Sequence, residues 1–275
     1  MHEGFLVHDR FKFFKWASAL CITSAVAYAI YDPLDVQSGG TWLGYGLGTI
    51  GALLILWLMW FGIRKRRYGG AFRLRAWLSA HVYLGLSLIV VGTLHTGFQL
   101  GWNVHTLAYV LMMLVIASGA FGIYAYARYP RLMTENRRGQ AVDEYLSQIS
   151  DIDRECRQVA GNLPDEITAQ VMKSCNETRI GGSCWRQLSG RDRRCASAEA
   201  FEELRQMSTN VSAGDGPAVR KLITLIGKKC SLLATVRRDI QLKALMDIWL
   251  HLHVPLSFAL LAALTAHIFS VFYYW

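Results

Sequence analysis

The chain has 275 residues, of which 53% are hydrophobic, and a formal net charge of +9 at pH 7. Its apolar residues are gathered into runs of about 20, the length that a bilayer-spanning helix needs, which excludes an ordinary soluble domain. The Lys and Arg residues lie beside these runs, so the positive charge is explained without nucleic acid, and we expect no nucleic-acid partner.

Five apolar runs predict five membrane-spanning helices. The first run is not typical of a signal peptide, because it lacks a clean small-residue cleavage site and begins with an aromatic cluster that suits a retained interfacial anchor. The sequence therefore predicts an all-α integral membrane bundle of five transmembrane helices. The runs cover residues 13–31, 43–63, 77–98, 105–127 and 248–272.

This organisation divides the chain into three segments. Residues 1–129 hold membrane helices one to four, residues 130–245 form a polar insert, and residues 246–275 hold membrane helix five. Basic residues flank alternate ends of the runs, whereas the loops DPLDVQSGG and QLGWNV contain neither Lys nor Arg. Because cytoplasmic loops carry an excess of these residues, we expect the N-terminus and the insert to lie inside a bacterial inner membrane and the C-terminus outside.

The insert begins and ends with amphipathic helical patterns. The stretch AVDEYLSQISDIDRECRQVAGNL and the region 218–245 both repeat apolar residues at three- and four-residue spacing, which indicates one apolar stripe on each helix. We expect an antiparallel helical hairpin with a less regular middle at 161–216. The second helix is expected to continue into the last span without a break.

Five of the six cysteines lie in the insert, where a reducing cytoplasm disfavours disulfides. The spacing of Cys175, Cys184 and Cys195 matches no compact zinc or iron–sulfur pattern, so we expect no iron–sulfur cluster. Cys156 and Cys230 fall on or beside the apolar stripes and are expected to be buried thiols. With the opposite topology, the same cysteines would be read as disulfides.

Four histidines form two pairs with the same spacing in two different spans. His81 and His95 are 14 residues apart in the third span, and His253 and His267 are 14 residues apart in the fifth. Fourteen residues of α-helix rise about 21 Å and turn about 1400°, so both rings of a pair face nearly the same side. Since these spans run in parallel, His81 should lie level with His253, and His95 with His267.

Ionisable groups at membrane depth are costly and mark function when a partner can be named. Two facing imidazoles suit the two axial positions of one haem iron, which predicts two non-covalent b-type haems, since the chain has no Cys-x-x-Cys-His motif. His251 is turned about 200° from His253 and should point away. His105 is interpreted as interfacial, or as a hydrogen-bond donor to a haem propionate or a quinone.

Small and basic residues near the histidines extend this hypothesis. Gly48 and Gly62 are also 14 residues apart and would let a flat macrocycle lie against the second span, although small residues equally serve close helix packing. Arg73 and Arg75 lie one to two turns before His81, where they would pair with the inner haem's propionates or serve only as topology determinants.

On the histidine spacing and the helix order, the membrane part resembles the ferric reductase and NADPH oxidase superfamily and, more distantly, respiratory cytochrome b. The resemblance implies that His81, His95, His253 and His267 are the haem ligands. The chain lacks the sixth span and the flavin and nicotinamide domain of that superfamily, and it has no Rossmann-like glycine fingerprint. Electrons are therefore expected to enter from a membrane quinol or a separate subunit, such as a c-type cytochrome, flavoprotein or iron–sulfur protein.

The sequence thus predicts a dihaem cytochrome b subunit that carries electrons across the membrane. Two other classes stay open. A proton or metal transporter would use the histidines as relays, but the spans hold almost no carboxylates beside them. A membrane anchor or scaffold would present the helical insert, with the histidines incidental.

Overall fold

The computed structural model describes residues 7–31, 38–64, 71–190, 195–209, 212 and 214–273, and it describes side chains for these residues except 61–64 and 71–74. All regular elements in this part of the chain are helices. They form two compact units, one comprising Met1–Phe121 with Leu250–Trp275 and the other Gly122–Trp249.

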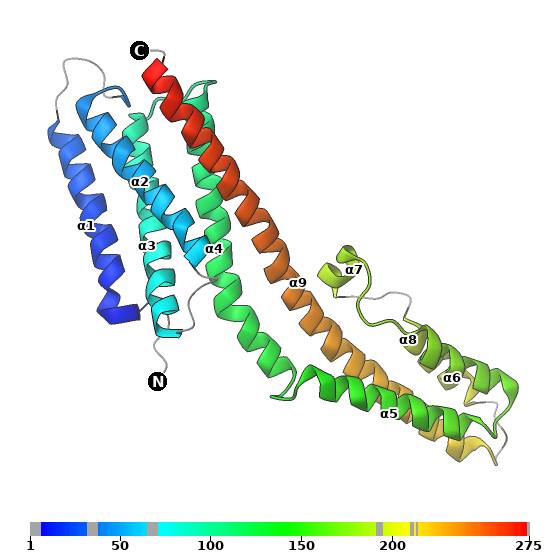
Figure 1. Cartoon of the computed structure of the whole chain (residues 1–275). Coiled ribbons are helices and arrows are strands. Elements are labelled where there is room, and N and C mark those ends of the chain that lie inside the picture. Colours follow the sequence, from blue (N-terminus) through cyan, green and yellow to red (C-terminus); the bar gives the residue numbers. More distant parts are fainter. Residues whose placement is uncertain are drawn as a thin grey trace. The chain divides into compact units, whose positions relative to one another are not determined.

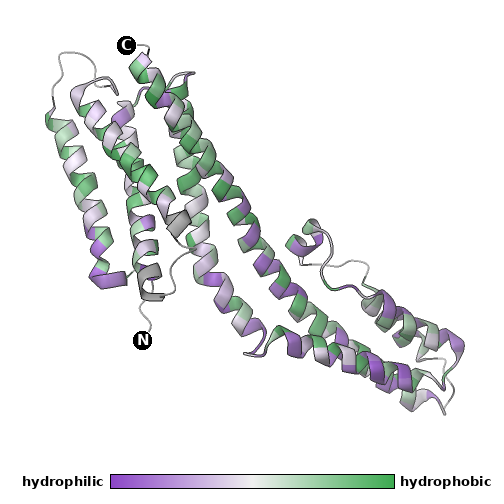
Figure 2. Cartoon of the chain, in the orientation of Figure 1, coloured by the Kyte–Doolittle hydropathy of each residue, from purple (hydrophilic) through white to green (hydrophobic). Residues whose placement is uncertain are grey.

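Five helices are long and apolar enough to cross a membrane, and each covers all or nearly all of one of the five predicted runs (Figures 1 and 2). The third of them packs against the first two. Two of the five extend beyond the apolar runs, into the insert. The helices are α1 (His8–Ile30), α2 (Trp42–Arg64), α3 (Ala71–Thr96), α4 (Val104–Asn136) and α9 (Gly216–Tyr273).

Large apolar side chains cover the outside of these helices. Ile30 is 77% exposed and Trp16 and Phe269 are also largely exposed, as expected for surfaces that contact lipid rather than water. The interior is a smaller apolar cluster drawn from four helices. Its buried members are Ile55, Leu58, Leu88, Met112, Leu260 and Leu264.

The middle of the insert, 161–216, is broken into short segments, less regular than the flanking helices as expected, but it contains three helices that were not predicted. Three helices lie there: α6 (Asp165–Glu177), α7 (Cys184–Ser189) and α8 (Ala196–Met207). They form because α6 and α8 each carry buried apolar positions, such as Val171 and Leu204, that complete a core with α5 (Val142–Ala160) and α9. As expected, α9 continues from the insert into the last span as one helix, with Pro255 inside it.

A buried ion pair lies inside the insert core. Lys229 Nζ is 2.6 Å from Asp153 Oδ1, and the lysine side chain is only 1% exposed. Lys229 also donates to the backbone carbonyl of Ser174 at 2.8 Å. Breaking such a pair by removing one partner typically costs about 3–5 kcal/mol, so this contact fixes how α5, α6 and α9 meet.

Two thiols lie beside this ion pair. Cys156 is buried, as its position on the stripe predicted, and Cys175 contacts the Asp153 carbonyl with Sγ 3.7 Å from the oxygen. Desolvation by burial raises the pKa of Cys156 to about 12 and the pKa of Cys175 to about 11. In the folded insert both thiols therefore stay neutral at pH values well above 9.0, the ordinary pKa of a cysteine thiol.

These raised pKa values predict that the stability of the insert falls as the pH rises. A thiol whose folded pKa is raised contributes stability that is fully present below its unfolded pKa and lost as pH rises toward the folded value. The urea midpoint of the insert, followed by pulse proteolysis of the full chain in detergent, should therefore fall between pH 8 and pH 10. The Cys156→Ala, Cys175→Ala double variant should show a shallower fall; equal slopes in the two proteins would contradict the burial of these thiols.

Candidate functional site

The structure brings the four predicted histidines together in two pairs. The ring centroids of His95 on α3 and His267 on α9 are 5.9 Å apart, with their planes at 85°. His81 and His253 lie close enough to interact electrostatically. Because each pair joins the corresponding positions of α3 and α9, the two helices run in parallel through this unit, as the spacing required.

The Nδ1 atoms of two of these histidines bond to oxygen atoms of α2 and α4. His95 Nδ1 lies 2.8 Å from the Gly44 carbonyl oxygen, which only accepts, so Nδ1 carries the proton. His253 Nδ1 lies 2.7 Å from Ser118 Oγ. Since Ser118 donates its own proton to the Val115 carbonyl at 2.8 Å, we assign the Nδ1–H of His253 as the donor to Oγ. Both rings are thereby set in the tautomer whose Nε2 carries the lone pair that a metal binds.

The other two histidines also have partners on α2 and α4. His267 Nδ1 pairs with Nδ1 of His105, which lies in the first turn of α4. His81 lies beside the backbone of Leu58 on α2. Thus α2 lies next to the histidines of α3, and α4 supplies side-chain partners to those of α9.

Glycines make room for the rings at both levels. A Cβ built on Gly48 would lie 2.6 Å from His95 Cε1, and one on Gly39 would lie 3.3 Å from the same atom. At the level of His81 and His253, a Cβ on Gly119 would lie 3.6 Å from His253 Cε1. Gly48 was predicted to make room for a flat macrocycle. In the structure, its lack of a side chain makes room for the imidazole ring of His95.

Other glycines of the spans serve helix packing. A Cβ at Gly92 would meet Met112 Cε at 2.6 Å, and one at Gly122 would collide with the indole of Trp249. A Cβ at Gly46 would meet no atom within 4 Å. The structure thus distinguishes two groups of glycines, those next to histidine rings and those next to apolar side chains. The sequence pattern did not distinguish them.

The ring separation of His95 and His267 is close to that of two imidazoles bound to one metal ion. Metal–imidazole bonds are about 2 Å long, so two rings on opposite sides of one iron have centroids about 6 Å apart once the ring radii are added. The observed 5.9 Å between His95 and His267 agrees with this value. The Nδ1–H of His95 and the glycine at position 48 are also compatible with such a site, so these residues can accommodate the group that the sequence predicted.

An apolar layer lies between the two histidine levels. Leu88 is seven residues from both His81 and His95, and Leu260 is seven residues from both His253 and His267. Both leucines are buried in one cluster with Met112. The space between the two histidine pairs is therefore lined by apolar side chains of α3, α4 and α9.

The remaining predicted residues differ in their exposure and contacts. Arg75 is exposed on α3, whereas Arg73 and Gly62 lie outside the part of the chain whose burial and side chains are described. His251 is exposed, whereas His253 is half-buried, in agreement with the predicted helical phase. His105 contacts His267, a partner that the sequence interpretation did not anticipate.

Ser118 and the Gly44 carbonyl were also missed, because a lone serine or a backbone oxygen has no sequence pattern that assigns it to a histidine. The fold adds a further cross-helix bond at the outer level, in which Thr93 and Tyr109 hydroxyls lie 2.9 Å apart. Among the described residues, no group of three or more His, Cys, Asp or Glu side chains could hold a metal ion, so the candidate ligands come in twos.

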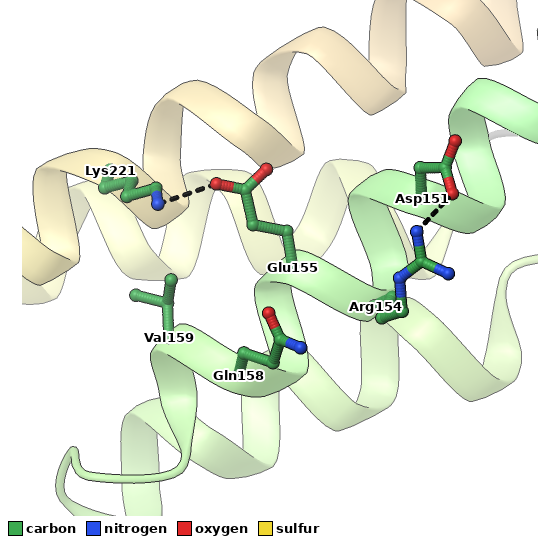
Figure 3. Close-up of a pocket in the computed structure, with 6 residues that line it drawn as sticks. All are labelled: Asp151, Arg154, Glu155, Gln158, Val159 and Lys221. Carbon is green, nitrogen blue, oxygen red and sulfur yellow. Dashed lines mark hydrogen bonds and ion pairs between the residues drawn. The ribbon is translucent and has the colours of Figure 1, made fainter.

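The insert has a surface hollow of about 430 Å³ on α5 and α9, shown in Figure 3. Its charges neutralise one another: Lys221 Nζ lies 2.6 Å from Glu155 Oε1, and Arg154 lies 2.7 Å from Asp151 Oδ1. These exposed pairs leave no uncompensated charge for a ligand, so we assign the hollow no role.

Comparison with known proteins gave no match for this chain. No family model matches the chain, and neither the curated proteins nor the solved structures gave a match. The functional argument therefore depends on the residues of this chain alone.

Gly48 offers a direct test of the outer pair. Gly48→Ala should displace the His95 ring, because the new Cβ would approach Cε1 to 2.6 Å, whereas Gly46→Ala meets no atom within 4 Å. Under the haem hypothesis, the first variant should lose haem at the His95–His267 pair and the second should match the wild type. Haem content per purified chain measures this, and equal content in both variants would contradict the close approach.

Proposed function

We propose that the chain is a dihaem b-type membrane cytochrome that carries electrons across a bacterial inner membrane. The observation that carries the proposal is the pair of matched histidine levels on α3 and α9, in which groups of α2 and α4 engage Nδ1 of His95, His253 and His267. Haem iron would supply the one-electron chemistry. The protein would supply the ligands, their orientation and a dry interior.

The chain's residues would divide this work between two sites. His81 and His253 would hold the inner haem, and His95 and His267 the outer one. Ser118 and His105 would keep the α9 ligands in place, since partners of a ligand's second nitrogen fix ring orientation and raise basicity. The 14-residue spacing would separate the two ligands of each helix by about 21 Å, and the leucine layer would fill the space between the levels.

Topology and partners follow from the charge pattern. The basic loops would hold the N-terminus and the insert in the cytoplasm and leave the C-terminus outside. The insert would dock a cytoplasmic redox subunit, such as a flavoprotein or iron–sulfur protein. The outer site would exchange electrons with a c-type cytochrome or a membrane quinone.

Ligand variants test the pairing. Replacing His95 or His267 by alanine should remove the same outer haem, and replacing His81 or His253 should remove the inner one. His251→Ala should retain both, because this side chain lies on the exposed face. Dithionite-reduced spectra and potentiometric titration of the purified variants distinguish these outcomes. If His251→Ala loses a haem and His253→Ala keeps both, the assignment of the inner ligand is wrong.

A second experiment tests the topology. Glu166 is exposed in the first turn of α6, so a cysteine placed there in a Cys184→Ser background reports the side on which the insert lies. A membrane-impermeant thiol reagent should leave Glu166→Cys unmodified in intact spheroplasts and modify it once the membrane is opened. Modification in intact spheroplasts would place the insert outside and exchange the inner and outer assignments.

A further inference from the structure

The short helix α7 carries an exposed tryptophan among basic residues. Trp185 is 83% exposed, and the nearby Ile180 is 39% exposed. Arg179 and Arg186 flank them and are also exposed. A tryptophan beside arginines is typical of a segment at a membrane–water boundary, because indole prefers the headgroup layer and guanidinium pairs with lipid phosphates.

Polar contacts hold α7 against α9 at the position of Gln241. Gln241 Nε2 donates to the Leu188 carbonyl at 2.8 Å, and Arg238 Nη1 donates to Gln241 Oε1 at 2.6 Å. Gly190 ends α7 with φ +63°, and a Cβ there would lie 2.7 Å from Gln241 Oε1. The glycine therefore permits both the left-handed turn and the close approach to α9.

Aromatic residues mark where the same unit enters the membrane. The ring of Tyr126 on α4 lies 5.5 Å from that of Trp249 on α9, and Tyr124 lies 6.0 Å from Tyr129. Such rings gather at the membrane interface. Between Gln241 and Trp249, α9 rises about 12 Å, and each headgroup layer is about 5–8 Å thick. The level of Gln241 therefore lies about 4–7 Å beyond the headgroup layer, a gap comparable to the length of a tryptophan side chain, so the exposed indole of Trp185 would have to cross it to enter the layer.

We propose that α7 is a peripheral membrane anchor, in which Trp185 enters the headgroup layer and Arg179 and Arg186 pair with anionic lipid phosphates. The inference rests on the membrane placement of α9 in the proposed function, and it is independent of the haems. Lipid is favoured over a protein partner because the exposed apolar surface here is one indole and one isoleucine, far less than the about 1,200 Å² buried in a stable protein interface.

A spin label tests the depth of α7. Cys184, which is exposed and adjacent to Trp185, would be labelled in the full chain reconstituted into phosphatidylethanolamine and phosphatidylglycerol vesicles. The control is a label at Glu166→Cys in the Cys184→Ser background, because Glu166 precedes Ile167, which packs with Leu222 about 28 Å further along α9 from Gln241. Relative access of oxygen and of a neutral nickel chelate reports the depth of each label.

We expect nickel access at Cys184 to be several-fold lower than at Glu166→Cys. Trp185→Ser should restore access to the control level, and Trp185→Tyr should retain most of the protection. Equal access at the two positions in wild-type vesicles would overturn the proposal. Protection at Cys184 in native membranes but not in these vesicles would also overturn it and indicate a protein partner. Chains that fail to float with vesicles would instead contradict the membrane placement.

Discussion

An imidazole ring inside an apolar helix bundle requires a polar partner for its nitrogens, and this requirement organises the membrane part of the chain. Burying a polar group without a hydrogen bond costs roughly 2–7 kcal/mol, and four such rings would be prohibitive in lipid. The Gly44 carbonyl, Ser118 and His105 each engage one Nδ1 atom. Iron ligation by Nε2 would satisfy the other nitrogen of each ring. The same four histidines would then account both for the helix contacts and for the cofactor.

The same requirement accounts for the small residues and the apolar layer. Gly48 and Gly119 let helix backbones approach the rings, and the cluster around Leu88 and Leu260 fills the space between the two levels. The insert meets its own polar constraint differently: Lys229 is neutralised by Asp153 inside an apolar core. The two units thus have separate cores, although α4 and α9 contribute residues to both.

Much of this arrangement could be predicted from the sequence, because it depends on periodicity. The five spans follow from apolar runs, and the pairing of histidines follows from two 14-residue spacings on parallel helices. The exposure of His251 and burial of Cys156 follow from helical phase in the same way. Contacts between helices could not be predicted: the His105–His267 pair, the Ser118 bond and the division of glycines depend on which faces meet. The helices between 161 and 216 were missed because each is short and acquires its stability from the core that it completes.

The count of haems in the purified wild-type chain tests the central claim most directly. Pyridine haemochrome analysis, combined with quantitative amino-acid analysis, gives the ratio of b-type haem to protein. Four histidines in two ligand pairs predict a ratio of two, with a low-spin spectrum in the reduced protein. A colourless chain that is helical by circular dichroism and floats with lipid vesicles would contradict the account, because the histidines would then have a role that needs no iron.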